Sequence, residues 1–71
     1  MNMRAIGARV RRERLAMDLS QVDASVRAGV GPRTWVDLEN GHINPTLGTL
    51  RAVCGVVGLR VSVLLAEGEE C

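Results

Sequence analysis

Aromatic residues are almost absent from this 71-residue sequence, which contains Trp35 but no Phe and no Tyr. Trp35 lies three residues before Leu38, and this helical spacing favours a core position over an anchor for a partner protein. A single aromatic side chain also means that the core must be built mostly from aliphatic residues.

Histidine and cysteine are scarce as well. The single histidine, His42, has no second His or Cys at ligand spacing, so neither a metal site nor a cofactor is expected. Cys54 sits at an apolar helical position and is expected in the core, whereas Cys71 is expected to be an exposed thiol. No Ser/His/acid set, Cys/His set or phosphate-binding glycine loop is present, so the sequence does not predict an enzyme.

No apolar run reaches the roughly 18 residues that a membrane span requires, so we expect no membrane contact. Two cysteines without a secretory signal favour a reduced, cytoplasmic setting. Lysine is absent, and each of the nine basic residues is an arginine. The planar guanidinium group of an arginine can donate two hydrogen bonds to a phosphate. The net charge of +1 argues against strong nonspecific binding to polyanions and leaves room for a local basic patch.

Charge is distributed unevenly along the chain. The first fourteen residues contain five arginines and a single acidic residue, Glu13, whereas residues 66–71 are acidic. We interpret these arginines either as a solvated helix face or, for Arg4 or Arg9, as contacts to a phosphate backbone.

Hydrophobic periodicity predicts one all-α domain over residues 1–71, with a core of about 4–65 and an acidic tail at 66–71. The expected helices cover about 3–17, a segment that begins after Ser20 and stops at the Gly29 turn, a segment that begins near Pro32 and stops at Asn40-Gly41, about 46–57, and 61–65. The last segment could also be a strand, because Leu59, Val61 and Val63 alternate with polar residues; we favour the helix. The side chains expected to face inward are Ile6, Val10, Leu15, Met17, Ala24, either Val26 or Ala28, Trp35, Leu38, Leu47, Leu50, Val53, Cys54 and Val57.

Short polar and glycine-containing signals separate these helices. Ser20 can cap the second helix, and Gly29 can make the tight turn that follows it. Asn40-Gly41 can end the third helix, and Pro45 can help to start the fourth. Two short helices joined by a glycine turn form the helix-turn-helix layout, whose second helix can enter the DNA major groove.

These signals occur in the order and spacing of the lambda-repressor-like, or Cro/XRE-type, helix-turn-helix family, which the chain resembles from about Ile6 to Leu65. The matching motifs are Leu19-Ser20-Gln21, the Gly29 turn, Leu38-Glu39-Asn40-Gly41 and Asn44-Pro45-Thr46-Leu47. The resemblance implies five helices around one core, binding to double-stranded DNA as a symmetric dimer, and transcriptional control. We therefore expect a cytoplasmic, nucleoid-associated regulator.

The resemblance also implies roles for individual residues. Arg14 and Glu39 match a structural ion pair, which we favour over a catalytic role for Glu39. The expected DNA contacts lie at the start of the second helix, along the third helix and in the following loop, and they are Gln21, Gly31, Pro32, Arg33, Thr34, Val36, Asp37, Asn40, His42 and Asn44. The alternatives are a solvent-facing Arg33, a helix-start role for Gln21 and a C-cap role for Asn40.

The third helix departs from the family in the residues that would read bases. Gly31 and Pro32 replace polar side chains, and Asp37 brings a negative charge that would repel phosphate or accept a hydrogen bond from a cytosine amine. Arg33 is then the one strong donor, so DNA shape is expected to contribute to specificity.

The main hypothesis is a sequence-specific regulator, acting as a repressor, that binds a palindromic operator as a homodimer. The dimer surface is expected near the C-terminus, at Leu59, Val61, Val63 and Leu64. Two alternatives keep the fold: the antitoxin of a toxin–antitoxin pair, and a module that binds another protein such as a second regulator.

Overall fold

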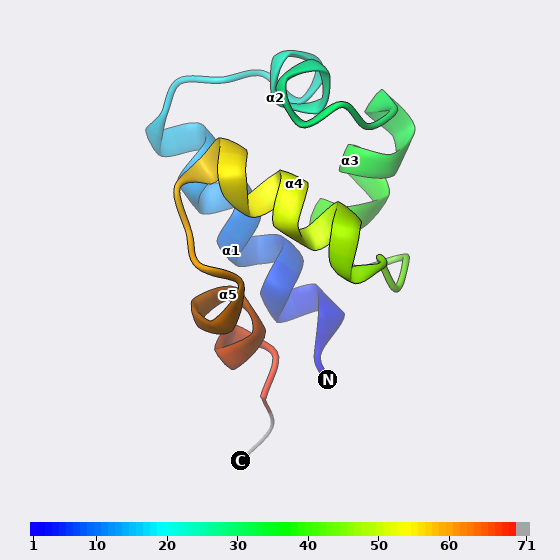
Figure 1. The fold of residues 1–71 in the computed structure, drawn as a ribbon, viewed down its shortest axis with the longest axis vertical. Helices are drawn as coiled ribbons and strands as arrows, with labels where there is room; N and C mark the ends of the chain where they lie inside the picture. The colour runs from blue at the N-terminus through cyan, green and yellow to red at the C-terminus, as the bar shows by residue number, and fades with distance from the viewer. Residues whose placement is uncertain (70–71) are drawn as a thin grey trace.

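The computed structural model describes residues 1–69, and all of their regular secondary structure is helical (Figure 1). The helices are α1 (Met3–Ala16), α2 (Gln21–Ala28), α3 (Pro32–Glu39), α4 (Leu47–Val57) and α5 (Val61–Glu67). The all-α prediction is confirmed, and the segment that could have been a strand is helix α5. Residues 70–71, which include part of the expected tail and Cys71, lie outside the described residues.

The ends of α2 and α3 are set by the residues that the sequence singled out. The Ser20 hydroxyl accepts a hydrogen bond from the Asp23 backbone N–H at 3.0 Å and so caps α2. Gly29 ends α2 in the left-handed region with φ of 71°, which costs glycine no steric strain. Pro32 occupies the first turn of α3, where its missing N–H would have no helical partner.

The other helices begin and end by similar local devices. The Asn2 side chain caps α1 by accepting from the Ala5 N–H at 3.1 Å, a cap that the sequence analysis did not identify. Asp18 adopts a left-handed φ of 59° after α1. Thr46, which follows Pro45, caps α4, and its hydroxyl accepts from the Thr49 N–H at 3.2 Å.

All five helices contribute to a single hydrophobic core. Its largest fully buried members include Trp35, Ile6 and Leu38, and each large side chain of this kind contributes roughly 1.5–3 kcal/mol on transfer from water. The buried hydrophobic residues are Met3, Ile6, Val10, Ala24, Trp35, Leu38, Leu50, Val53, Cys54, Val57 and Leu64.

Three residues expected in the core are exposed instead. Leu15 is 56% exposed because the inward position on that turn of α1 belongs to the neighbouring Arg14. Met17 follows the last residue of α1, and Leu47 lies in the first turn of α4, ahead of that helix's buried stripe. Helical spacing alone did not reveal where each helix runs past its packing partners.

Burial decides two further assignments, the inward-facing residue at the end of α2 and the role of Leu64. Of the two candidates at the end of α2, Ala28 is half-buried against the core and Val26 is 72% exposed. Leu64, expected at a dimer surface, is fully buried, because α5 turns this side chain toward the core of its own chain. Leu64 is therefore a core residue and presents no surface to a second copy.

Two glycines allow α1 to seat directly on the C-terminal end of α3. A Cβ atom at Gly7 would lie 2.3 Å from the Leu38 carbonyl oxygen and 2.4 Å from that of Glu39. A Cβ atom at Gly41 would lie 2.7 Å from the Arg4 Cα, and Gly41 also has a φ of 73°. This close approach sets the position of α3 relative to α1.

The fold extends beyond the core boundary of residue 65 that we expected. The Asn2 N–H donates to the Gly68 carbonyl at 2.6 Å, and the Arg9 guanidinium is paired with Glu67. Residues 66–68 are thus held against α1 and are not a tail. In the described part of the chain no single helix is long and apolar enough to cross a bilayer; α4 and α5 pass only as a pair, bent by 102°.

Candidate nucleic-acid interface

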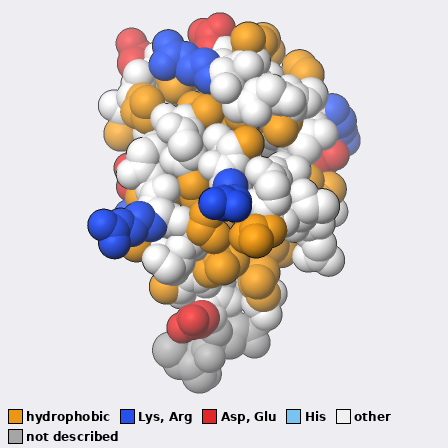
Figure 2. All heavy atoms as spheres, viewed as in Figure 1, with side chains coloured by type: hydrophobic (Ala, Val, Ile, Leu, Met, Phe, Trp, Pro, Cys, Tyr) orange, Lys and Arg blue, Asp and Glu red, His pale blue; other side chains and the backbone are white. Residues whose placement is uncertain are grey.

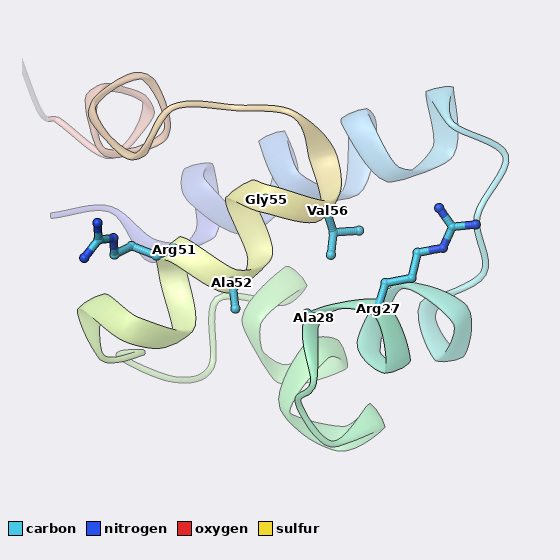
Figure 3. A pocket seen from close by; sticks show the side chains of 6 residues that line it. All are labelled: Arg27, Ala28, Arg51, Ala52, Gly55 and Val56. Atoms are coloured by element: carbon cyan, nitrogen blue, oxygen red, sulfur yellow. The ribbon is translucent and has the colours of Figure 1, made fainter.

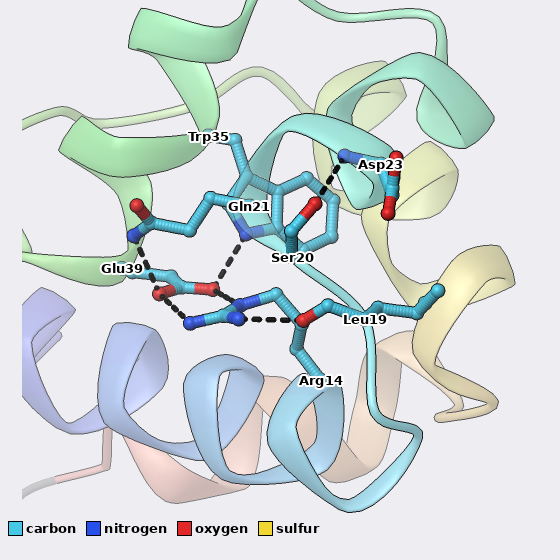
Figure 4. Close-up of polar contacts among 7 residues, drawn as sticks. All are labelled: Arg14, Leu19, Ser20, Gln21, Asp23, Trp35 and Glu39. Carbon is cyan, nitrogen blue, oxygen red and sulfur yellow. Dashed lines mark hydrogen bonds and ion pairs between the residues drawn. The ribbon is translucent and has the colours of Figure 1, made fainter.

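The Glu39 carboxylate lies at the centre of a buried polar network that joins the first three helices (Figure 4). Arg14 on α1 reaches it twice, from Nε to Oε2 at 2.6 Å and from Nη2 to Oε1 at 3.1 Å. The Trp35 indole N–H donates to Oε2 at 2.5 Å, and the Gln21 amide donates to Oε1 at 3.0 Å. Arg14, Gln21 and α3 are therefore held in one fixed arrangement.

The two charges of the network are paired where they are buried. Burial by itself raises the pKa of Glu39, but the hydrogen bonds from Arg14, Trp35 and Gln21 outweigh it, so the pKa lies below its ordinary value. Arg14 also donates from Nη1 to the Leu19 carbonyl at 2.7 Å, which anchors the segment leading into α2. Within residues 1–69 no buried side-chain nitrogen or oxygen lacks a partner.

The residues expected to contact DNA lie at or near the surface of α2, α3 and the loop after α3. Gln21 is half-buried, and its amide nitrogen is turned inward to Glu39. Asn40 is the C-cap of α3, as the alternative assignment proposed, and it is also exposed. Of the others, the exposed residues are Gly31, Pro32, Arg33, His42 and Asn44, and the half-buried ones are Thr34, Val36 and Asp37.

An ion pair on α3 was not anticipated from the sequence. Arg33 Nε lies 3.2 Å from Asp37 Oδ1, one helical turn away. The Arg33 side chain is 84% exposed, whereas that of Asp37 is 21% exposed. The spacing of four residues between opposite charges was the available signal.

The arginines of α1 have different surroundings. Arg9 is engaged within the chain, with Nε 2.9 Å from Glu13 and a second pair to Glu67. Arg4 is exposed and lies against Gly41, at the start of the loop after α3. Arg4 is therefore the arginine of this pair that neighbours the candidate interface.

Comparison with known proteins identifies this arrangement. Residues 5–67 match the protein family described as a helix-turn-helix domain. The chain belongs to this helix-turn-helix family. It is the lambda-repressor-like, Cro/XRE-type DNA-binding class that the motifs indicated. In this helix-turn-helix, α2 and α3 are the two helices and Gly29 lies in the turn between them.

Individual relatives of the helix-turn-helix domain have regulatory names. The chain is 34% identical over 62 residues to the immunity repressor protein of Bacillus phage phi105, an alignment that covers 87% of this chain and 43% of the relative. The chain thus spans less than half the length of that protein. Two crystal structures of the clp gene regulator ClgR from Corynebacterium glutamicum superpose with TM-scores of 0.82 and 0.84 at 25% identity. Both cover 96% of this chain, and they match over 88% and 72% of their own chains.

A hollow of about 350 Å³ lies between α2 and α4, apart from the residues expected to contact DNA (Figure 3). Its floor contains Ala28, Ala52, Gly55 and Val56. Arg27 and Arg51 lie at opposite ends and extend away from each other, so their guanidinium groups do not converge on a ligand. Among the described residues no group of three or more His, Cys, Asp or Glu side chains is placed to hold a metal ion.

Proposed function

We propose that this protein is a DNA-binding transcription regulator, acting as a repressor, that places α3 in the major groove of an operator. The observation that carries the proposal is Arg33, an exposed arginine in the first turn of α3, on a helix whose position the buried Glu39 network fixes. Arg and guanine form the commonest specific contact in the major groove. The names of the relatives support regulation as the outcome of binding. The proposal places the protein in the cytoplasm, at the nucleoid.

The neighbouring polar residues would position the domain on the phosphate backbone. Gln21 at the start of α2, Asn40 at the end of α3, and His42 and Asn44 in the loop are the proposed backbone contacts. Arg4, beside this loop, adds a positive charge there. Because each phosphate contact releases counterions, affinity should fall as the salt concentration rises.

A homodimer on a palindromic site is the assembly that we propose. One half-site gives limited affinity, and a two-fold dimer reads two half-sites about one helical turn, roughly 34 Å, apart. The surface available for pairing includes Val63, which is 41% exposed, beside the half-buried Leu59 and Val61. Hydrophobic side chains gather in the lower half of the face shown in Figure 2, below α4 and beside α5.

A second candidate function is protein binding, as an antitoxin or as the partner of another regulator. It is supported by Val22 and Val26 on α2, which are 56% and 72% exposed and lie one helical turn apart. In this alternative the same domain would use α2 for a protein contact.

Selection from a randomised duplex pool at low salt, followed by sequencing and fluorescence-anisotropy titration, tests the DNA-binding function. We expect the wild-type protein to enrich a palindrome, and Arg33→Ala to relax one base pair in each half-site at a cost of about 1–3 kcal/mol. Arg12→Ala removes another exposed arginine, on α1, and should leave the base preference unchanged. Failure of the wild type to enrich any sequence would overturn the proposal, and a stable hetero-complex would then favour the protein-binding alternative.

A further inference from the structure

The ion pair between Arg33 and Asp37 is oriented against the dipole of α3. Arg33 is the second residue of the helix and Asp37 is the third from its end. The N-terminus of a helix favours negative side chains and its C-terminus favours positive ones, and α3 has neither an acidic residue in its first turn nor a basic one in its last. Ion pairs between residues four positions apart also stabilise a helix better when the acidic residue comes first in the sequence. Helix stability therefore gains less from this pair than it would from the opposite order of charges.

The geometry of the pair leaves the reading end of Arg33 available. The shortest approach is between Nε and Asp37 Oδ1, at 3.2 Å, and neither terminal Nη amino group donates a hydrogen bond to Asp37. These two groups form the end of the guanidinium fork that donates in parallel to O6 and N7 of one guanine. An arginine that is 84% exposed would otherwise sample many rotamers, including those that reach phosphate oxygens.

We propose that Asp37 is a positioning residue that holds the Arg33 fork toward the edge of a guanine. Its carboxylate restrains Nε, and its negative charge opposes a phosphate at the same place. Asp37 thereby lowers affinity for DNA of any sequence and raises the preference for a guanine under the first turn of α3. This inference rests on the proposed function and specifies the base that each half-site must contain.

The test compares two duplexes by anisotropy: the site enriched by the wild-type protein, and the same site with A·T in place of the G·C pair that Arg33→Ala relaxes. The wild type should prefer the first duplex by about fivefold or more, the lower limit for one bidentate arginine contact. In Asp37→Ala we expect the ratio of the two affinities to fall by about threefold or more. The affinity for the A·T duplex should stay the same or rise. Asp37→Asn keeps the shape of the side chain and removes its charge, so the ratio should fall as it does in Asp37→Ala, because the contact is an ion pair.

Two controls separate positioning from a general charge effect. Asp23→Ala removes an exposed carboxylate from α2 without touching the cap, since the Asp23 backbone N–H makes the bond to Ser20. It should change both affinities by the same factor. In the Arg33→Ala background, Asp37→Ala should leave the ratio unchanged, because the group that it positions is gone. A positioning role predicts this coupling, whereas a purely structural role does not.

The inference fails if Asp37→Ala keeps the wild-type ratio, if the ratio falls equally with and without Arg33, or if the pair relaxed by Arg33→Ala is A·T. In each of these cases the proposed function stands, because a site was enriched. If the wild type enriches no site, the proposed function fails and takes this inference with it.

Discussion

Glu39 is the residue on which most of the buried polar structure converges. Its pairing with Arg14 was indicated by family resemblance, whereas the donors Trp35 and Gln21 became visible only in the structure. A buried ion pair of this kind adds little stability compared with apolar residues of similar shape. Its loss is costly all the same, because the remaining partner stays buried without a counter-charge.

Replacing Glu39 with Gln should therefore lower the free energy of unfolding by about 3–5 kcal/mol, since the Arg14 charge loses its partner. That is a large share of the stability of a small domain, which is on the order of 5–15 kcal/mol. Urea unfolding followed by Trp35 fluorescence measures the change. Glu13→Gln is the matched control, because its pair with Arg9 lies near the surface and should contribute little to stability. Equal losses in the two variants would contradict the prediction.

Glu39→Gln should also make the free energy of unfolding less dependent on pH in the acid range. The folded-state pKa of Glu39 lies below its ordinary value, so its contribution is present above the unfolded-state pKa of about 4.3 and is lost as the pH falls through the folded-state value. Wild-type stability should thus decline below about pH 4 more steeply than that of Glu39→Gln. Parallel declines would assign the acid sensitivity to other carboxyl groups.

At the scale of elements, the contact between α1 and α3 depends on Gly7. Backbone atoms of α3 occupy the position where a side chain would begin, and a backbone cannot move aside as a flexible side chain can. Gly55 in α4 is the opposite case: nothing lies within 4 Å of a Cβ placed there, on the floor of the hollow in Figure 3.

Alanine at these two glycines should have opposite effects on the free energy of unfolding. Gly7→Ala should lower it by about 1–3 kcal/mol or more, because the added methyl group overpacks the junction. Gly55→Ala should raise it by roughly 0.5–1 kcal/mol, because the substitution favours the helix without a clash. Chemical denaturation of both variants provides the measurement. A Gly7→Ala protein as stable as Gly55→Ala would show that α1 does not seat tightly on α3.

At the scale of the whole molecule, α5 is the element that we propose pairs with a second copy. It is held in place by Leu64 in the core and by the contact of Glu67 with Arg9, so its outer side is presented by a fixed helix. Val63 is the exposed large hydrophobic residue on that side.

Val63→Asp should shift the protein toward monomer, because a carboxylate would be buried without a partner at the proposed interface. Sedimentation equilibrium at several protein concentrations measures this shift. Val26→Asp makes the same change at an exposed valine on α2 and should leave the association constant unchanged. An unaltered dimer in Val63→Asp would place the interface elsewhere.

The sequence by itself determined the local features of this protein. Ser20, Gly29 and Pro32 mark the ends of α2 and α3 correctly, because caps and turns involve residues only a few positions apart. The order of these signals along the chain also predicted the family. The helical spacing around Leu50 and Trp35 identified most of the core for the same reason.

Only the tertiary structure decided which surfaces meet. Leu15 proved exposed and Leu64 buried, because burial depends on where neighbouring helices begin and end and not on periodicity alone. The close approach at Gly7 and the hydrogen bond from Trp35 to Glu39 depend on distances between backbones that are set by packing. The orientation of Arg33 toward Asp37 depends on side-chain rotamers, so the arginine that we propose reads a base could be found in the sequence but its geometry could not.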